Sequence, residues 1–212
     1  MFKSIPIFLA VLNTVSSFSA QTTTSPIQNF LGSLFPNTQN NNNAAVFELK
    51  QQLISECRAN IGYCTPEIRQ CIEDIMYQLS PLNPTKDTAT SPLLQKEWIL
   101  LWTSEKEINF FLEKGFSDEI TQTLIGDTLT NNIPFVKGGF FGVTGEISID
   151  EQSEGLKRTN FKFTKATLDL AKWGGYSFPP IGAGWFDTIY LDSDLRIDTN
   201  SRNDILICRA DN

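Results

Sequence analysis

From Lys96 to the C-terminus, short apolar and aromatic runs alternate with turns rich in Gly, Asn, Asp and Pro. Many short strands joined by frequent turns are typical of antiparallel sandwiches and barrels. Helices do not alternate with these runs, which argues against a parallel α/β fold. The predicted strands are Glu97–Thr103, Glu119–Ile125, Thr128–Phe135, Phe140–Ile149, Leu156–Phe163, Ala166–Leu170, Gly184–Leu191, Asp194–Ile197 and Asp204–Arg209, with one short helix at Glu105–Lys114.

This pattern predicts a mainly β protein whose antiparallel β-barrel occupies residues 92–212. A closed barrel of about eight strands has an interior that is filled by side chains or holds one small ligand. The chain contains 16 Phe, 4 Trp and 4 Tyr, so it has enough aromatic surface for either. The segment Glu105–Phe116 has an apolar side, which is consistent with a packed cap, a lid or a helix that touches a membrane.

A helical hairpin is predicted over residues 46–84. Val46–Ala59 carries apolar residues at helical spacing, and Gly62 interrupts the pattern. The second helix starts at Thr65-Pro66-Glu67, which combines an N-cap hydroxyl, a proline in the first turn and an acid near the helix N-terminus. Pro81 and Pro84 mark its end.

The N-terminus has the features of a leader. Lys3 followed by the apolar run Ile5–Leu12 predicts a signal peptide over residues 1–17, with cleavage after Ser17. Residues 18–45 carry no charge and are rich in Ser, Thr, Asn and Gln. This composition fits a disordered N-terminus of the mature chain. It also fits the second part of a two-part plastid targeting leader, and both alternatives stay open.

Composition excludes several classes of function. The chain has no histidine, which rules out Ser-His-Asp and Cys-His catalysis and every His-ligated metal site. Its net charge of −7 does not suit nucleic acid, and no apolar run is long enough for a transmembrane span. The sequence also lacks a phosphate-binding glycine motif. We therefore predict no enzyme activity, no catalytic residue, no metal and no cofactor.

Four cysteines are present, at Cys57, Cys64, Cys71 and Cys208. The first three lie in the predicted helical hairpin, where Cys57 pairs with Cys64 or Cys71 if the compartment is oxidising. Buried free thiols are the alternative.

The string Gly182-Ala183-Gly184-Trp185-Phe186-Asp187-Thr188-Ile189-Tyr190-Leu191-Asp192-Ser193-Asp194-Leu195-Arg196-Ile197 resembles the signature of the plastid lipid-associated protein family, also called fibrillins or plastoglobulins. The strand ending in Trp98-Ile99-Leu100-Leu101-Trp102-Thr103-Ser104 and the pattern of Arg158 with Phe161-Lys162-Phe163 are similar to other strands of that family. Lys96, and the segment 198–203 after the Arg-Ile pair, depart from the family pattern, so the chain resembles a divergent member.

This resemblance implies a lipocalin-like barrel without established catalysis. It also implies a plastid location at plastoglobules or thylakoids, with a secreted protein as the alternative. The expected function is binding of a hydrophobic small molecule, such as a prenyl lipid, carotenoid, quinone or acyl lipid, in the barrel cavity. The alternative is a structural coat protein of lipid globules that encloses no ligand. The expected partners are therefore a hydrophobic ligand and a lipid globule or thylakoid surface.

Candidate site residues follow from the same resemblance and from the aromatic clusters. Tyr190, Asp192, Asp194 and Arg196 are expected to form a polar network at one barrel end, either structural or holding the polar head of a ligand. Arg209 is expected to stack over Trp98, as in lipocalins. The residues predicted to contact a ligand are Tyr190, Arg196, Trp98, Trp102, Phe141, Phe163 and Trp185.

Overall fold

The computed structural model describes residues 38–117, 119–179 and 182–211. The predicted signal peptide and most of the segment 18–45 lie outside these residues. The chain divides into units 1–45 and 46–212, and the contacts described below belong to the second unit.

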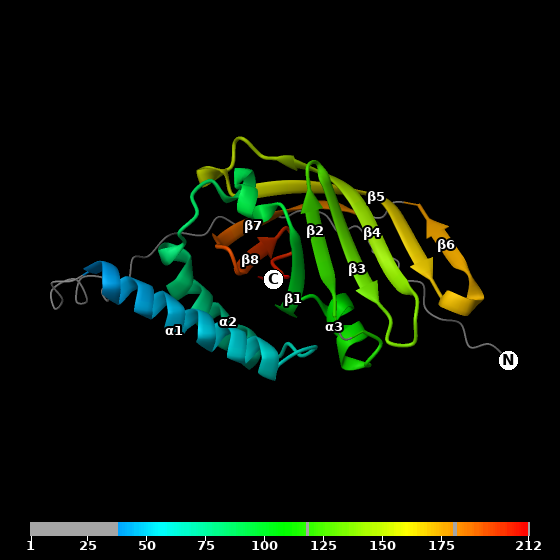
Figure 1. The fold of residues 1–212 in the computed structure, drawn as a ribbon, viewed down its shortest axis with the longest axis horizontal. Coiled ribbons are helices and arrows are strands. Elements are labelled where there is room, and N and C mark those ends of the chain that lie inside the picture. The colour runs from blue at the N-terminus through cyan, green and yellow to red at the C-terminus, as the bar shows by residue number, and fades with distance from the viewer. Residues whose placement is uncertain (1–37, 118, 180–181, 212) are drawn as a thin grey trace. The chain divides into compact units, whose positions relative to one another are not determined.

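Two helices, α1 and α2, precede the sheet, and a third, α3, follows its first strand (Figure 1). The helices and short 3-10 turns are α1 Thr38–Ala59, α2 Pro66–Leu79, η3 Ser80–Leu82, η4 Thr88–Thr90, η5 Pro92–Leu94, α3 Lys106–Glu113, η6 Glu154–Leu156 and η7 Ala171–Trp173. The strands are β1 Glu97–Thr103, β2 Thr121–Ile125, β3 Thr128–Pro134, β4 Phe140–Ile149, β5 Arg158–Asp169, β6 Gly175–Phe178, β7 Ala183–Leu191, β8 Leu195–Asn200 and β9 Ile205–Ala210.

Local sequence explains the start of α2 better than the start of α1. The Thr65 hydroxyl accepts a hydrogen bond from the Ile68 backbone N–H at 3.3 Å, and Pro66 occupies the first helical position. These are the cap contacts that the sequence predicts. Helix α1 begins at Thr38, earlier than the apolar stripe indicates. Its extension runs through an Asn tract that has low helix propensity.

The nine strands form one antiparallel sheet in the order β4-β3-β2-β1-β9-β8-β7-β5-β6. An additional pairing of β4 with β5 closes the sheet into a ring and leaves β6 outside it, at the right edge of Figure 1. Ring closure removes the free edges that an open sheet would present. The mainly β antiparallel fold predicted from the sequence is thus confirmed.

Strand β5 shows where the predicted strand boundaries fail. The sequence divides it into two strands, but the structure has one strand with a register shift opposite Thr144 and Gly145. Thr164 is the extra residue, so the strand bends at this bulge without ending. A Cβ at Gly145 would lie 2.7 Å from the Lys162 carbonyl oxygen, and only glycine allows this approach. Strand β6 was not predicted, because it is short and all four of its residues are exposed.

Two separate apolar cores result from this topology. The outer core packs α1 and α2 against the outside of the ring and includes Leu53, Ile72, Trp102, Tyr190 and Ile197. The inner core draws on strands all around the ring and includes Trp98, Leu124, Leu129, Phe186 and Cys208. Successive residues of a strand face opposite sides of the sheet. Each strand that lies between the helices and the ring interior therefore contributes side chains to both cores.

All four cysteines are free thiols in this structure. Cys57 belongs to the outer core and Cys208 to the inner core, and burial raises the pKa of both thiols, that of Cys208 to about 12. Buried thiols of this kind are chemically inert. Of the two alternatives left open by the sequence, this structure has the free thiols.

The outer core gives a test of how the helices are held. Leu53 is fully buried in it, so Leu53→Ala is expected to lower the free energy of unfolding by about 2–5 kcal/mol, measured by urea denaturation. Phe47→Ala on the same helix is the control, because Phe47 is 63% exposed. An unchanged urea midpoint for Leu53→Ala would show that α1 does not pack on the ring.

Candidate functional site

Pairing register decides which side chains face the inside of the ring. Directly paired residues of antiparallel strands project to the same side, so one known inward residue fixes its partners. Trp98 is inward and pairs with Gln122 and Ala210, Gln122 pairs with Asn131, and Cys208 pairs with Arg196. Continued around the ring, the same pairing defines two inner walls. The apolar wall consists of inward aliphatic and aromatic side chains on β4 and β5. The polar wall consists of inward polar side chains on β2, β3 and β8.

The apolar wall remains partly accessible although it faces inward. Its side chains are half-buried, whereas inward residues on the other side of the ring, such as Leu124 and Cys208, are 0–1% exposed. Closely packed protein interiors do not leave this many apolar side chains accessible. The ring is therefore open to solvent along β4 and β5. The accessible inward residues are Phe141, Val143, Ile147, Phe161, Phe163 and Leu168.

The polar wall is built around a buried ion pair. The Arg196 Nη2 lies 2.8 Å from Asp198 Oδ2, and both side chains are at most 2% exposed. The Thr188 hydroxyl donates to Asp198 Oδ1 at 2.7 Å, and Arg196 Nη2 also donates to the Gln122 side-chain oxygen. Desolvation raises the pKa of Asp198, while Arg196 and Thr188 oppose the rise. These contacts offset part of the cost of burying two charges.

Two inward donors lack a hydrogen-bond partner among the described residues. Arg196 Nη1 and Thr159 Oγ1 are buried and make no hydrogen bond within the described chain. Thr159 pairs with Phe186, and the Arg196 guanidinium carbon lies 5.7 Å from the centre of the Phe186 ring. An unpaired buried donor costs free energy, so such groups usually have a water or ligand partner. Both side chains face the interior of the ring.

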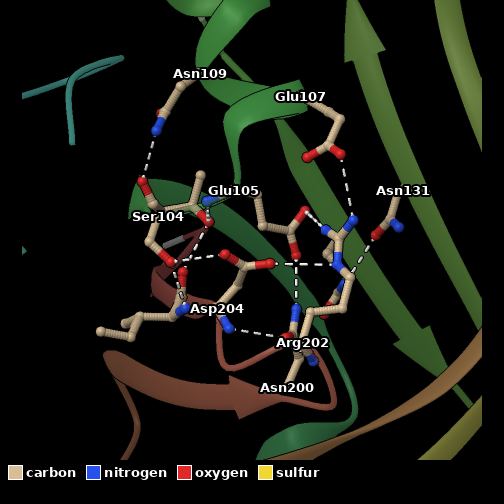
Figure 2. A network of polar contacts seen from close by, with 11 residues as sticks. Ser104, Glu105, Glu107, Asn109, Asn131, Asn200, Arg202 and Asp204 are labelled. Carbon is tan, nitrogen blue, oxygen red and sulfur yellow. Dashed lines mark hydrogen bonds and ion pairs between the residues drawn. The ribbon is translucent and has the colours of Figure 1, made fainter. Parts of the chain in front are cut away.

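A second polar cluster lies at one end of the ring, where α3 follows β1 (Figure 2). Glu105 accepts a hydrogen bond from Asn200 Nδ2 at 2.9 Å and lies 3.5 Å from Arg202 Nη2. Arg202 also contacts Glu107 at 3.4 Å and Asp204 at 3.3 Å. Burial raises the pKa of Glu105 from 4.5 to about 7, although Arg202 acts to lower it. The cluster ties the start of α3 to the β8–β9 turn.

The residues predicted to contact a ligand fall on both sides of the ring. Four of them face the interior, namely Trp98, Phe141, Phe163 and Arg196. Tyr190 and Trp102 instead belong to the outer core beneath the helices. Trp185 faces outward next to inward Phe186, with the Arg158 guanidinium carbon 3.7 Å from its ring centre.

The predicted polar network is present without Arg196. The Asp192 carboxylate accepts hydrogen bonds from the Tyr190 hydroxyl at 2.9 Å and from Lys50 Nζ of α1 at 2.6 Å. Lys50 also lies 3.7 Å from Asp194. Burial works to raise the pKa of Asp192, but the Lys50 contact and two backbone N–H groups lower it below its ordinary value. The network therefore fastens α1 to the outside of the ring.

Arg209 does not stack over Trp98, because it pairs with Ile99 and so faces outward. Arg196 takes that place, with its guanidinium carbon 5.4 Å from the centre of the Trp98 ring. Arg209 lies 4.0 Å from Glu119 on the surface.

Sequence reasoning missed several interior polar residues. Asp198 had a usable signal, since an acid two residues after Arg196 shares its side of a strand. Gln122, Asn131 and Thr159 had none, because their inward direction depends on register. Glu105 was placed in a short helix, and its burial depends on the distant turn at Asn200–Asp204.

Two further properties concern the described residues. No group of three or more His, Cys, Asp and Glu side chains among them is arranged to hold a metal ion. None of the helices in that part of the chain is long and apolar enough to cross a membrane.

The fold thus defines a closed antiparallel β-ring with two helices packed on its outside and an interior of mixed polarity. Residues 47–181, well over half of the chain, match the PAP_fibrillin family model. The chain belongs to this family. It is also 34% identical over 125 residues to a protein of Arabidopsis thaliana named probable plastid-lipid-associated protein 11, chloroplastic. The match covers 56% of this chain and 57% of that relative. No solved structure matches the chain significantly.

Glu105 gives a pH-dependent prediction. Because its pKa is higher in the folded state, near 7, than in the unfolded state, the folded state binds the proton more tightly. This stabilising contribution is present at pH values below 4.5 and is lost as the pH rises through about 7. The melting temperature of Glu105→Gln should therefore decline less than that of the wild type across this range.

Glu107→Gln is the matched control, since Glu107 is an exposed carboxylate that contacts the same arginine, Arg202. Thermal denaturation followed by circular dichroism measures both variants. Parallel pH profiles for Glu105→Gln and the wild type would contradict the assignment.

Proposed function

We propose that this chain is a plastid lipid-associated protein that holds an elongated apolar molecule inside its β-ring. The observation that carries the proposal is the accessible apolar wall on β4 and β5, where six inward side chains are only half-buried. Ligand sites are typically concave and mostly apolar, with a few polar groups that fix orientation. The interior has this composition.

Unpaired donors that face the interior suggest which part of the ligand they would contact. Arg196 Nη1 and Thr159 Oγ1 are donors without partners, and both lie close to Phe186. Once neighbouring side chains shift to admit it, a carbonyl or ether oxygen on an otherwise apolar molecule would pair with one of these donors without placing a further charge beside Asp198. Molecules with this combination include quinones, oxygenated carotenoids and acyl lipids.

Family membership and the chloroplastic relative support the lipid class and the plastid compartment. The chain spans 57% of that relative's length, so a shared activity of the whole proteins is part of the proposal. Because the free interior donors bear on an enclosed ligand and not on a lipid coat, ligand binding is the function proposed.

Filling the apolar wall should weaken ligand binding. Val143 faces inward and is half-buried, whereas the next residue, Thr144, faces outward on the same strand. Val143→Trp is expected to weaken binding of the methyl ester of cis-parinaric acid, a fluorescent polyene with one uncharged carbonyl end, by about tenfold or more. Fluorescence titration measures the affinity.

Thr144→Trp adds the same side chain to the outer face and should bind like the wild type. Circular dichroism establishes that both variants fold, since overfilling a packed core is destabilising. Equal affinities for the two folded variants would contradict an interior site.

A further inference from the structure

Strand β6 presents its aromatic side chains to the inner side of the sheet. Tyr176 pairs with Leu168 and Phe178 pairs with Ala166, and both of these β5 residues face the ring interior. Directly paired residues of antiparallel strands project to the same side, so the two aromatic side chains also project inward. Ser177, between them, faces outward. Strand β6 therefore alternates apolar inside and polar outside, the pattern of a strand whose inner side is covered.

The inner side of β6 is nevertheless accessible. Tyr176 is 52% exposed and Phe178 is 42% exposed, whereas Ala166 on the neighbouring strand is 4% exposed. Large apolar side chains that face inward without being buried leave apolar surface open to water, and such surface marks a site of interaction. An occupant of this surface must be apolar, because none of the four β6 residues carries a charge.

The inner side of β6 is continuous with the apolar wall. Strand β4 pairs along the whole of one edge of β5, so β7 and β6 share the other edge. Strand β7 pairs with Arg158–Lys162, and β6 pairs with Ala166–Asp169. Leu168, which belongs to the apolar wall, lies directly beside Tyr176. The apolar wall thus extends beyond the start of β7 onto β6, at the right edge of Figure 1.

Backbone contacts hold β6 in line with this wall. A Cβ at Gly139, in the β3–β4 loop, would lie 2.2 Å from the Asp169 carbonyl oxygen, so the loop packs directly against the end of β5 and only glycine fits. The Asp169 carboxylate accepts a hydrogen bond from the Ala171 backbone N–H at 2.7 Å. The Leu170 backbone N–H donates to the Gly174 carbonyl oxygen at 3.1 Å. The turn into β6 is therefore fixed at its base.

The two ends of the extended wall differ in polarity. Thr159, whose buried hydroxyl lacks a partner among the described residues, pairs with Ile149 at the end of β4. Leu168 pairs with Phe141 near the start of β4 and lies beside β6. At about 3.3 Å per residue, β5 spans roughly 30 Å between Thr159 and Leu168. A molecule whose oxygen lies near Thr159 therefore reaches β6 only with a long apolar chain.

We propose that Tyr176 and Phe178 form the far end of the ligand site and select apolar chains long enough to pass beyond the start of β7. This inference rests on the proposed ligand binding and adds the length of chain that the site prefers. An apolar chain fits this surface better than a protein partner does, because the surface of β6 continues along the wall into the ring. A shorter chain that ends beside Phe163 would leave β6 uncovered.

Competition binding with esters of different chain length tests this selection. Methyl laurate and methyl behenate share one head group, but the behenate chain is nearly twice as long. Both are supplied as cyclodextrin complexes, which keep them in solution, and displace the methyl ester of cis-parinaric acid from the full chain. Each protein is compared with the wild type on the same complexes, so the contribution of cyclodextrin cancels.

The double variant Tyr176→Ser/Phe178→Ser should bind methyl behenate about tenfold more weakly than the wild type does, because affinity falls by about threefold to fourfold for each CH₂ group left uncovered. Its affinity for methyl laurate should equal that of the wild type. Both substituted side chains are exposed, so the double variant should fold like the wild type, as circular dichroism measures.

Tyr77→Ser is the matched control, because it removes a 73% exposed aromatic side chain from α2, outside the ring. It should leave the affinities for both esters unchanged. The affinity of each protein for the fluorescent ester is measured first, so that displacement is converted into affinity separately for each variant.

Four results would overturn the inference. Unchanged affinity of the double variant for methyl behenate would show that β6 does not contact the chain. Equal losses for both esters would show that its effect is not on chain length. Ester affinities that stay unchanged while a wild-type dimer becomes a monomer in the double variant would make β6 a contact between two copies of the chain. Failure of the wild type to bind either ester would overturn the proposed function, and this inference with it.

Discussion

The pairing of β4 with β5 is the interaction on which the rest of the structure depends. It closes the sheet, and closure gives every strand of the ring one inner and one outer side. The bulge at Thr164 and the close approach at Gly145 let β5 bend enough to pair with β4 along its length while meeting β7 at one end and β6 at the other. Without this pairing, the apolar wall of β4 and β5 would be the surface of an open sheet.

Closure also explains why the polar groups divide into separate sets. Outside the ring, Asp192 and Lys50 fasten a helix to a strand. Inside, Arg196 and Asp198 form a desolvated pair whose burial costs several kcal/mol before hydrogen bonds offset it. A fold that needed only stability could fill this space with apolar side chains. Retention of a charged pair with an unpaired donor inside a ring that also carries an accessible apolar wall supports the proposed ligand binding.

Alternation of apolar residues was enough to predict most of the sheet, and β1 and β4 have the predicted bounds. The assignment of residues to the two sides of the ring was less successful. Tyr190 and Arg196 are close in sequence, but a register shift between Thr188 and Tyr190 puts them on opposite sides. A one-residue change of register reverses every side chain that follows, and bulges leave no clear signal in one sequence. Strand β6 was not predicted for a different reason. Its aromatic residues are exposed, and their exposure depends on the tertiary structure.

The most direct test of an enclosed ligand is native mass spectrometry of the protein purified from its own cells, combined with organic extraction of the same sample. The interior described above predicts one apolar, oxygen-containing molecule per chain, released on extraction. A chain that carries no such molecule, yet still floats with lipid globules on centrifugation, would contradict ligand binding. It would leave the inner residues as core and support a coat protein.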